Sequence, residues 1–158
     1  MKTLIAYSTK YGTTKMCANL LGEKLGTDVT LANISETRNI NLSPFDCVII
    51  GGPIYMGRLK SNTKKFCYRH QDVLATKKVG LFVCHLENEK SIVDIMATQF
   101  PGKLFDAAAV TNGFGGASLV SKMKGMDKFM FTKIAKSTED KENINYANIE
   151  DFAKTMQT

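Results

Sequence analysis

Apolar runs that alternate with helical patterns constrain the fold of this chain more than any other feature of its sequence. The runs lie at residues 2–7, 28–33, 46–50, 78–84 and 104–110, and apolar residues at helical spacing occur at 14–25, 61–74 and 88–98. Short strands separated by helices indicate a parallel sheet with helices on both faces. We therefore predict an α/β fold, a doubly wound five-stranded parallel sheet with strand order 2-1-3-4-5.

The length and composition suit one globular domain, which we assign to residues 1–158. The chain is 44% hydrophobic, enough for a core, but it has no apolar run that could span a membrane and no secretory signal. We therefore expect a cytoplasmic protein. The four cysteines, Cys17, Cys47, Cys67 and Cys84, form neither a C-x-x-C pair nor a zinc spacing, so we expect buried thiols and no metal site.

Two loops of the predicted sheet should carry the binding chemistry, because ligands of this fold bind where the strand order reverses. The first loop, Ser8-Thr9-Lys10-Tyr11-Gly12-Thr13-Thr14, leads directly into a helix. Its hydroxyls, its glycine and the helix N-terminus suit an anion, and we expect Thr13 or Thr14 to cap the helix. Because the loop matches neither the P-loop nor G-x-G-x-x-G, a monophosphate is the expected ligand.

The second loop is Gly51-Gly52-Pro53-Ile54-Tyr55-Met56-Gly57-Arg58, which we expect to end the third strand at Gly51. Its glycines and proline remove side chains and stiffen the backbone. Ile54, Tyr55 and Met56 are apolar or aromatic although loops are usually polar, so they either tuck under the loop or form a wall against a flat ligand. Because the neighbouring first loop is expected to bind an anion, we favour the second interpretation, a wall against a flat ligand.

The segment Ile5-Ala6-Tyr7-Ser8-Thr9-Lys10-Tyr11-Gly12-Thr13-Thr14, with Ala18 and Leu21, resembles the phosphate-binding signature of the flavodoxin family. The resemblance implies a flavodoxin-like sheet and FMN as the cofactor, with Ser8 to Thr14 around the phosphate. It implies that Pro53 to Arg58 lie against the isoalloxazine ring, with Gly57 where the family's peptide flips on reduction. Lys10 has no counterpart in typical flavodoxins.

The resemblance also implies that the loop with His85, Leu86 and Glu87 covers the other side of the ring and its pyrimidine edge. The chain has no tryptophan to stack on the flavin. Tyr55 and His85 would take that place, although a solvated His85 is the alternative. Arg58 and Lys10 lie beside the expected site, so we expect them to ease formation of the reduced flavin anion.

Residues 122–136 gather most of the charge of the chain. They carry five lysines against Asp127 alone, a net charge of +4 within the +6 of the whole chain. Six large apolar residues interleave with the lysines: Met123, Met126, Phe129, Met130, Phe131 and Ile134. A helix over about 120–136 either covers the sheet with its lysines in water or meets an anionic membrane surface or an acidic protein. A polar hinge (STEDKEN, 137–143) and a helix at 146–156 should follow.

The C-terminal half narrows the resemblance. GFGG at 113–116, the basic segment, and NYANIEDFAK at 145–154 resemble the flavodoxin-domain subgroup that contains menaquinone-dependent protoporphyrinogen oxidase. We expect an FMN-binding flavodoxin-like redox protein that transfers electrons between protein partners. One alternative is a protoporphyrinogen-oxidase-type FMN oxidoreductase that delivers electrons to a quinone, docked at the inner face of the membrane. Another is a flavin-free signalling module. No side chain is nominated as catalytic, and no nucleic-acid partner is expected.

Overall fold

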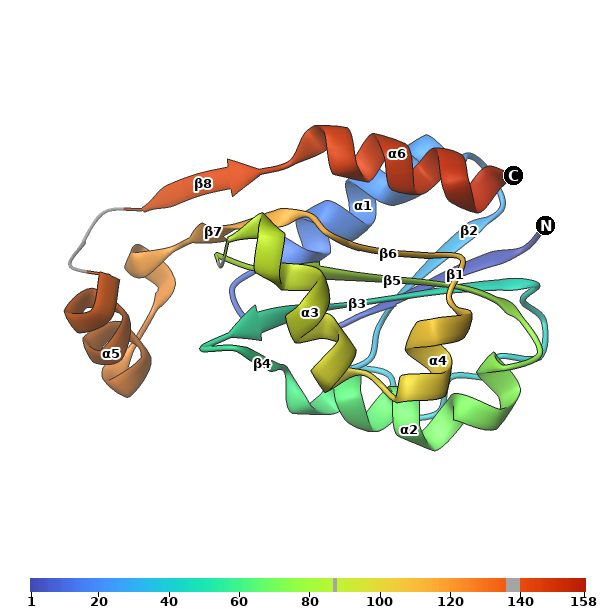
Figure 1. The fold of residues 1–158 in the computed structure, drawn as a ribbon, viewed down its shortest axis with the longest axis horizontal. Helices are drawn as coiled ribbons and strands as arrows, with labels where there is room; N and C mark the ends of the chain where they lie inside the picture. Colours follow the sequence, from blue (N-terminus) through green and yellow to red (C-terminus); the bar gives the residue numbers. More distant parts are fainter. Residues whose placement is uncertain (87, 136–139) are drawn as a thin grey trace.

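The main sheet has the strand order that the sequence predicts. The computed structural model describes residues 1–86, 88–135 and 140–158. The five parallel strands are, in spatial order, β2 (Val29–Asn33), β1 (Thr3–Tyr7), β3 (Cys47–Tyr55), β5 (Lys78–Cys84) and β6 (Val110–Gly113). A short antiparallel strand, β4 (Arg58–Leu59), pairs with the end of β3. Numbered by parallel strands alone, the order is 2-1-3-4-5, which confirms the flavodoxin-like topology (Figure 1).

The third strand runs past the point where we expected it to end. Gly51 and Gly52 pair in parallel register with Phe82 and Val83 of β5, and β3 continues to Tyr55. A Cβ at position 51 would lie 2.0 Å from the ring of Phe82. The prediction of a loop from Gly51 onward was therefore wrong, because these glycines make room for side chains inside the sheet rather than ending the strand.

The fifth strand lies later in the chain than predicted. Most of the run at 104–110 forms the helix α4 (Gly102–Ala107), and β6 begins only at Val110. Leucine and alanine favour helices, whereas the β-branched residues Val110 and Thr111 suit a strand. Apolar character alone could not separate the two elements.

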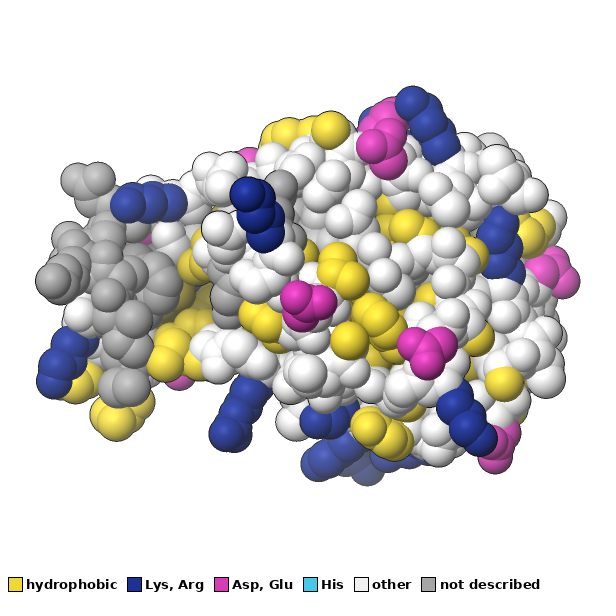
Figure 2. Space-filling model, viewed as in Figure 1, with side chains coloured by type: hydrophobic (Ala, Val, Ile, Leu, Met, Phe, Trp, Pro, Cys, Tyr) yellow, Lys and Arg dark blue, Asp and Glu magenta, His cyan; other side chains and the backbone are white. Residues whose placement is uncertain are grey.

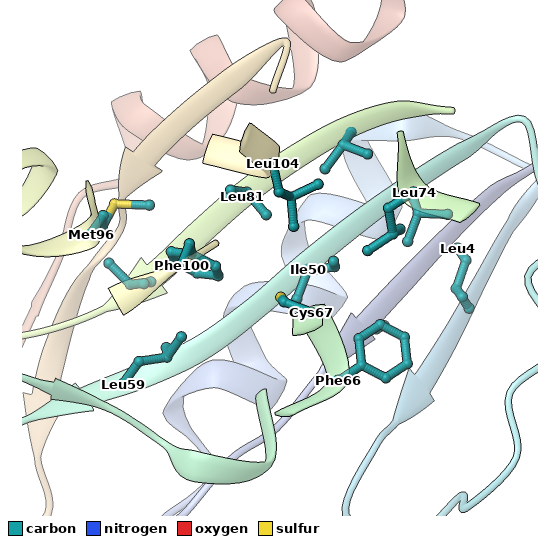
Figure 3. Close-up of a cluster of buried hydrophobic side chains, with 14 of the residues drawn as sticks. Leu4, Ile50, Leu59, Phe66, Cys67, Leu74, Leu81, Met96, Phe100 and Leu104 are labelled. Atoms are coloured by element: carbon teal, nitrogen blue, oxygen red, sulfur yellow. The ribbon is translucent and has the colours of Figure 1, made fainter. Parts of the chain in front are cut away.

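Helices cover both faces of the sheet and enclose two apolar layers (Figure 1). On one face lie α1 (Thr13–Leu25) and α6 (Tyr146–Gln157); on the other lie α2 (Ser61–Leu74), α3 (Glu89–Gln99) and α4. Figure 3 shows the apolar layer on the face that α2, α3 and α4 cover, where side chains of these helices point toward Ile50 and Leu81 of the sheet. All four cysteines are buried, as predicted.

A two-stranded ribbon extends beyond the main sheet. It pairs β7 (Gly115–Ser118) with β8 (Lys141–Ile144) in antiparallel register. The glycine-rich segment 112–116 is largely strand, and so is the end of the expected polar hinge. Residues 136–139, on which the rest of that hinge falls, lie outside the described residues. The ribbon carries the segment between β7 and β8 past the carboxyl edge of the sheet (Figure 1).

The basic segment does not cover the sheet. It forms a 3-10 turn, η1 (Val120–Lys122), and the helix α5 (Gly125–Ala135), which Figure 1 shows apart from the helices on the two faces. Met126 is 71% exposed and Phe129 56% exposed. The expectation of a sheet-covering helix was therefore wrong, because the ribbon carries α5 beyond the sheet. The side chains of Met130, Phe131 and Ile134 lie outside the part of the chain that the structure describes.

None of the helices within the described ranges combines the length and the apolar character that crossing a bilayer requires.

Candidate functional site

A cavity of about 280 Å³ lies at the carboxyl ends of the central strands, where the strand order reverses. It is enclosed by the loop after β1, the β3–β4 hairpin, the residues after β5, and β7. The predicted site residues that line it are Thr9, Lys10, Tyr11, Thr13, Thr14, Pro53, Ile54, Tyr55, Arg58, His85 and Leu86. Two loops and a third segment that lie far apart in the sequence thus meet at one cavity, as the switch-point argument requires.

The N-terminus of α1 opens toward this cavity without a capping side chain. Its N-cap residue is Gly12, with a φ of 98°, and no acidic residue occupies the first turn. The expectation that Thr13 or Thr14 caps the helix was wrong, because both already lie inside the first turn. Thr9 Oγ1 instead accepts the Gly12 N–H at 2.9 Å. The first-turn N–H groups and the positive end of the helix dipole are left for an anion.

The Thr14 hydroxyl is a buried polar group at the cavity. Thr14 is 1% exposed, and its Oγ1 has no hydrogen-bond partner of normal geometry among the described residues, although the Cys84 thiol lies beside it. A buried hydroxyl without a partner is costly. An oxyanion at the helix N-terminus would accept a hydrogen bond from it, so the residues present fit a phosphate group.

Two predicted residues of the first loop support the cavity without lining it. Ser8 is fully buried, and its hydroxyl shares a short hydrogen bond with the Thr63 hydroxyl of α2. Gly12 supplies the left-handed turn that starts α1. The structure therefore places Ser8 beneath the loop, where it ties the end of β1 to α2.

The β3–β4 hairpin forms one wall of the cavity. Tyr55 and Arg58 face each other across a two-residue turn in which Met56 and Gly57 have φ values of 54° and 75°. Positive φ at both positions is the geometry of a type I′ turn, which matches the twist of the paired strands. The turn points Met56 away, 52% exposed, so Ile54 and Tyr55 form the wall while Met56 and Gly57 do not line the cavity.

His85 is held in place by glycines at the end of β6 and the start of β7. It is 4% exposed, its Nε2 accepts the Gly115 N–H at 3.3 Å, and its own backbone N–H donates to the Gly115 carbonyl at 2.8 Å. A Cβ at Gly113 would lie 2.3 Å from Nε2, so glycine is needed there. The alternative of a solvated histidine was wrong. Leu86 lines the cavity and is half exposed, and Glu87 lies outside the described residues.

Asp127 at the start of α5 joins the two predicted loops. Its Oδ2 lies 2.5 Å from the Lys10 Nζ and accepts the Tyr11 hydroxyl at 2.6 Å, and its backbone carbonyl accepts the Tyr55 hydroxyl at 3.3 Å. The hydrogen bonds from Lys10 and Tyr11 hold the pKa of Asp127 below its usual value. We did not predict this role; the only signal was that Asp127 is the single acid in a lysine-rich segment.

Lys10 therefore already interacts with side chains of the protein itself. Besides its ion pair with Asp127, its Nζ lies 5.0 Å from the ring centre of Tyr55, within cation–π range. Burial, and then the Asp127 charge, raise the pKa of Tyr55. Tyr55 thus stays a neutral phenol, and the charge of Lys10 is largely balanced by Asp127.

Six further residues line the cavity that the sequence did not predict: Leu59, Lys60, Cys84, Gly116, Ala117 and Met123. Leu59 and Lys60 adjoin the predicted hairpin. A hydrogen bond with Cys17, followed by burial, raises the pKa of the Cys84 thiol, so this residue acts as a protonated, apolar part of the lining. Gly116, Ala117 and Met123 reach the cavity because of the path of the β7–β8 ribbon, which no local sequence pattern indicates.

Comparison with known proteins agrees with this geometry. A family profile described as "Flavodoxin domain" matches residues 4–145. The protoporphyrinogen IX dehydrogenase (quinone) of Escherichia coli K12 is 26% identical over 97% of this chain and 91% of that protein. Two-electron reduced Megasphaera elsdenii flavodoxin superposes with a TM-score of 0.65 at 17% identity, covering 98% of each chain.

A flavoprotein from Lactobacillus acidophilus NCFM, solved in complex with FMN, has a TM-score of 0.51 at 20% identity, covering 73% of this chain and 91% of that one. The Escherichia coli relative matches the subgroup that the C-terminal half suggested. Because the family profile spans most of the chain, and because the sheet order and the switch-point cavity agree with it, this chain belongs to the flavodoxin-domain family.

Proposed function

We propose that this chain binds FMN at the carboxyl edge of the sheet and passes electrons between protein partners. The observation that carries the proposal is the first turn of α1, where uncapped N–H groups and the unpartnered Thr14 hydroxyl meet at a cavity. The flavodoxin-domain match and the FMN complex of the Lactobacillus relative support FMN as the anion that fills it.

The phosphate group would be held by neutral donors. Thr14 contributes its hydroxyl, and Thr13 and Thr14 contribute N–H groups at the positive end of the α1 dipole. Because Lys10 is already paired with Asp127, it adds little net charge there. This arrangement would bind a phosphate monoester through directed hydrogen bonds from neutral donors and not through an ion pair with a lysine.

The flat ring of the cofactor would lie between two walls. Ile54 and Tyr55 form one wall, while His85 and the backbone of Gly116 form the other. His85 cannot swing freely, because Gly115 fixes its ring and its backbone. A bound flavin accepts and releases electrons, and the protein supplies its position and electrostatic surroundings.

A comparison of FMN with riboflavin tests the proposal. Binding is measured by quenching of flavin fluorescence for the wild type, Thr14→Val and the matched control Thr155→Val on the exposed face of α6. Removing a hydrogen bond to a charged group costs about 1.5–3 kcal/mol, so Thr14→Val should bind FMN about 10–100 times more weakly. Its riboflavin affinity should not change. Equal FMN affinity in all three proteins, or no flavin binding at all, would refute the proposal.

A quinone as electron acceptor is the second candidate, favoured by the surface of α5. Met126 and Phe129 are exposed among lysines, and Asp127 ties this helix to the cavity. Lysines around exposed apolar side chains suit an anionic membrane surface, where quinones reside. The Escherichia coli relative is a quinone-linked protoporphyrinogen IX dehydrogenase.

Electron transfer assays separate the two candidates. The FMN-loaded protein is reduced chemically, and its reoxidation is followed with anionic or neutral vesicles that contain a lipid-soluble quinone. Faster turnover with anionic vesicles, lost in Met126→Gln/Phe129→Gln, would favour the quinone. Reoxidation by a redox protein alone, unaffected by vesicles, would favour the carrier function.

A further inference from the structure

A second cavity, of about 200 Å³, lies between the chain that connects β2 to β3 and the helix α2. It is lined by Arg38, Asn39, Ile40, Asn41, Arg69 and His70. None of these residues lines the cavity at the carboxyl edge of the sheet. It is therefore a separate site from the proposed flavin cavity.

The residues that line this second cavity carry positive charge. Its lining includes two arginines and no acidic residue. Within the described ranges, no carboxylate forms an ion pair with Arg38 or Arg69. Figure 2 shows further Lys and Arg side chains gathered over α2, at the lower edge of the molecule. Two guanidinium groups at one small cavity repel each other unless an anion lies between them.

The polar groups of the lining are suited to donating hydrogen bonds. Asn41 Oδ1 accepts the Ser43 N–H at 3.0 Å, which leaves its amide NH₂ group to donate. Burial, and then the charge of Arg69, lower the pKa of His70, so its imidazole is neutral at pH 7. A neutral imidazole can donate one hydrogen bond to an anion.

The donors are presented by anchored parts of the fold. Ile40, which separates Asn39 from Asn41 in the sequence, packs against the apolar layer that lies between the sheet and α2. On α2, the His70 ring contacts the Phe66 ring with centroids 4.6 Å apart, and Phe66 is buried. The connection contributes Arg38 and the helix contributes Arg69, and each segment is anchored near its arginine by a packed side chain.

We propose that this cavity binds the phosphate group of a small molecule. Guanidinium groups bind phosphate oxygens through paired hydrogen bonds, and two of them with an asparagine amide match a compact tetrahedral anion. Either inorganic phosphate or a phosphate monoester would satisfy this chemistry. The proposal does not depend on flavin binding.

A titration with inorganic phosphate, followed by ¹H–¹⁵N NMR at constant ionic strength, tests this proposal. Amide signals of residues 38–41 and 69–70 report on the second cavity, and those of 12–15 report separately on the α1 N-terminus. We expect saturable shifts at 38–41 and 69–70, with affinity reduced at least about tenfold in Arg69→Gln and in Arg38→Gln. The matched control Lys65→Gln, exposed on α2 but outside the cavity, should keep its affinity within about twofold.

The same titration with glycerol phosphate distinguishes the two sources of the group. Tighter binding than that of inorganic phosphate would assign the cavity to a phosphate ester, and weaker binding would assign it to the free ion. Shifts that do not saturate, or equal weakening in Lys65→Gln and Arg69→Gln, would overturn the proposal, because they would show general attraction to a basic surface.

Discussion

Asp127→Asn should weaken the contact between α5 and the loop that follows β1. The aspartate carboxylate binds the Lys10 ammonium and the Tyr11 hydroxyl at 2.5 and 2.6 Å. Asparagine has nearly the same shape but no charge, so it removes the ion pair and weakens the hydrogen bond from Tyr11. The hydrogen bond from Tyr55 goes to the backbone carbonyl of residue 127 and does not depend on the side chain.

The exposure of these groups sets the expected size of the effect. The Lys10 and Asp127 side chains are 39% and 34% exposed, and such a pair contributes about 0.2–1 kcal/mol. The hydrogen bond from Tyr11 to a charged acceptor adds about 1 kcal/mol at this exposure. Losing both costs about 1–2 kcal/mol, which makes local opening of α5 about 5–30 times more frequent.

Hydrogen exchange measures this opening directly. We expect the backbone amides of 125–135 to exchange about 5–30 times faster in Asp127→Asn, while those of α6 keep their wild-type rates. The matched control is Asp106→Asn, an exposed residue of α4. Exchange at 125–135 within about twofold of the wild type would refute the reasoning, because it would mean that Asp127 does not hold α5.

The pH dependence of this contact follows from the lowered pKa of Asp127. A carboxylate with a lowered pKa stabilises the folded arrangement above its ordinary pKa of 3.8, and that contribution disappears as the pH falls through the lowered value. Protection of 125–135, corrected for the intrinsic exchange rate, should therefore stay constant between pH 7 and about pH 5. A gradual loss of protection over that range would contradict the assignment of Asp127 as the holding group.

Three further predictions concern the flavin, the core and the thiols. Because Asp127 balances Lys10, Arg58→Glu should lower the reduction potential of bound flavin on the order of tens of millivolts. Lys65→Glu makes the same charge change away from the cavity and should leave the reduction potential unchanged. A redox titration that gives equal potentials for the two variants would refute this prediction. Gly51→Ala should destabilise the protein by about 1–3 kcal/mol in denaturant unfolding, since the new Cβ meets the Phe82 ring, whereas Gly102→Ala meets nothing within 4 Å and should be nearly neutral. A thiol reagent at pH 8 should leave the native cysteines unmodified, because all four are buried and burial raises the pKa of Cys67 to about 12; rapid labelling before unfolding would contradict the burial.

The sheet order and the place of the main cavity could be predicted from local patterns. Apolar runs between helices identify parallel strands, and right-handed crossovers leave few orders for them. Once the order was known, the loops after β1 and β3 had to meet at one edge. The hydroxyl-rich loop from Ser8 to Thr14 and the apolar residues Ile54 and Tyr55 were therefore expected at one edge of the sheet, and residues of both line the same cavity.

The errors in the secondary structure came from reading glycine and apolar runs locally. Gly51 and Gly52 suggested a loop, but the strand continues because Phe82 and Thr63 occupy the space that larger side chains would need. The run at 104–110 was apolar enough for a strand, yet its first half is α4. At the two glycines the decisive neighbours come from other parts of the chain. At 104–110 the helix propensity of leucine and alanine outweighs the apolar pattern.

The sequence by itself determined the layers, the strand order and the edge at which chemistry occurs, because these follow from periodicity and chain connectivity. Only the tertiary structure decided that Asp127 binds Lys10 and Tyr11, and that Arg38 lines the same cavity as Arg69 and His70. Charges in sequence reveal how many cations a segment carries, but not which of them are balanced. That depends on contacts between distant segments, and here it leaves Lys10 balanced by Asp127 while Arg38 and Arg69 share a cavity without an acidic residue in its lining.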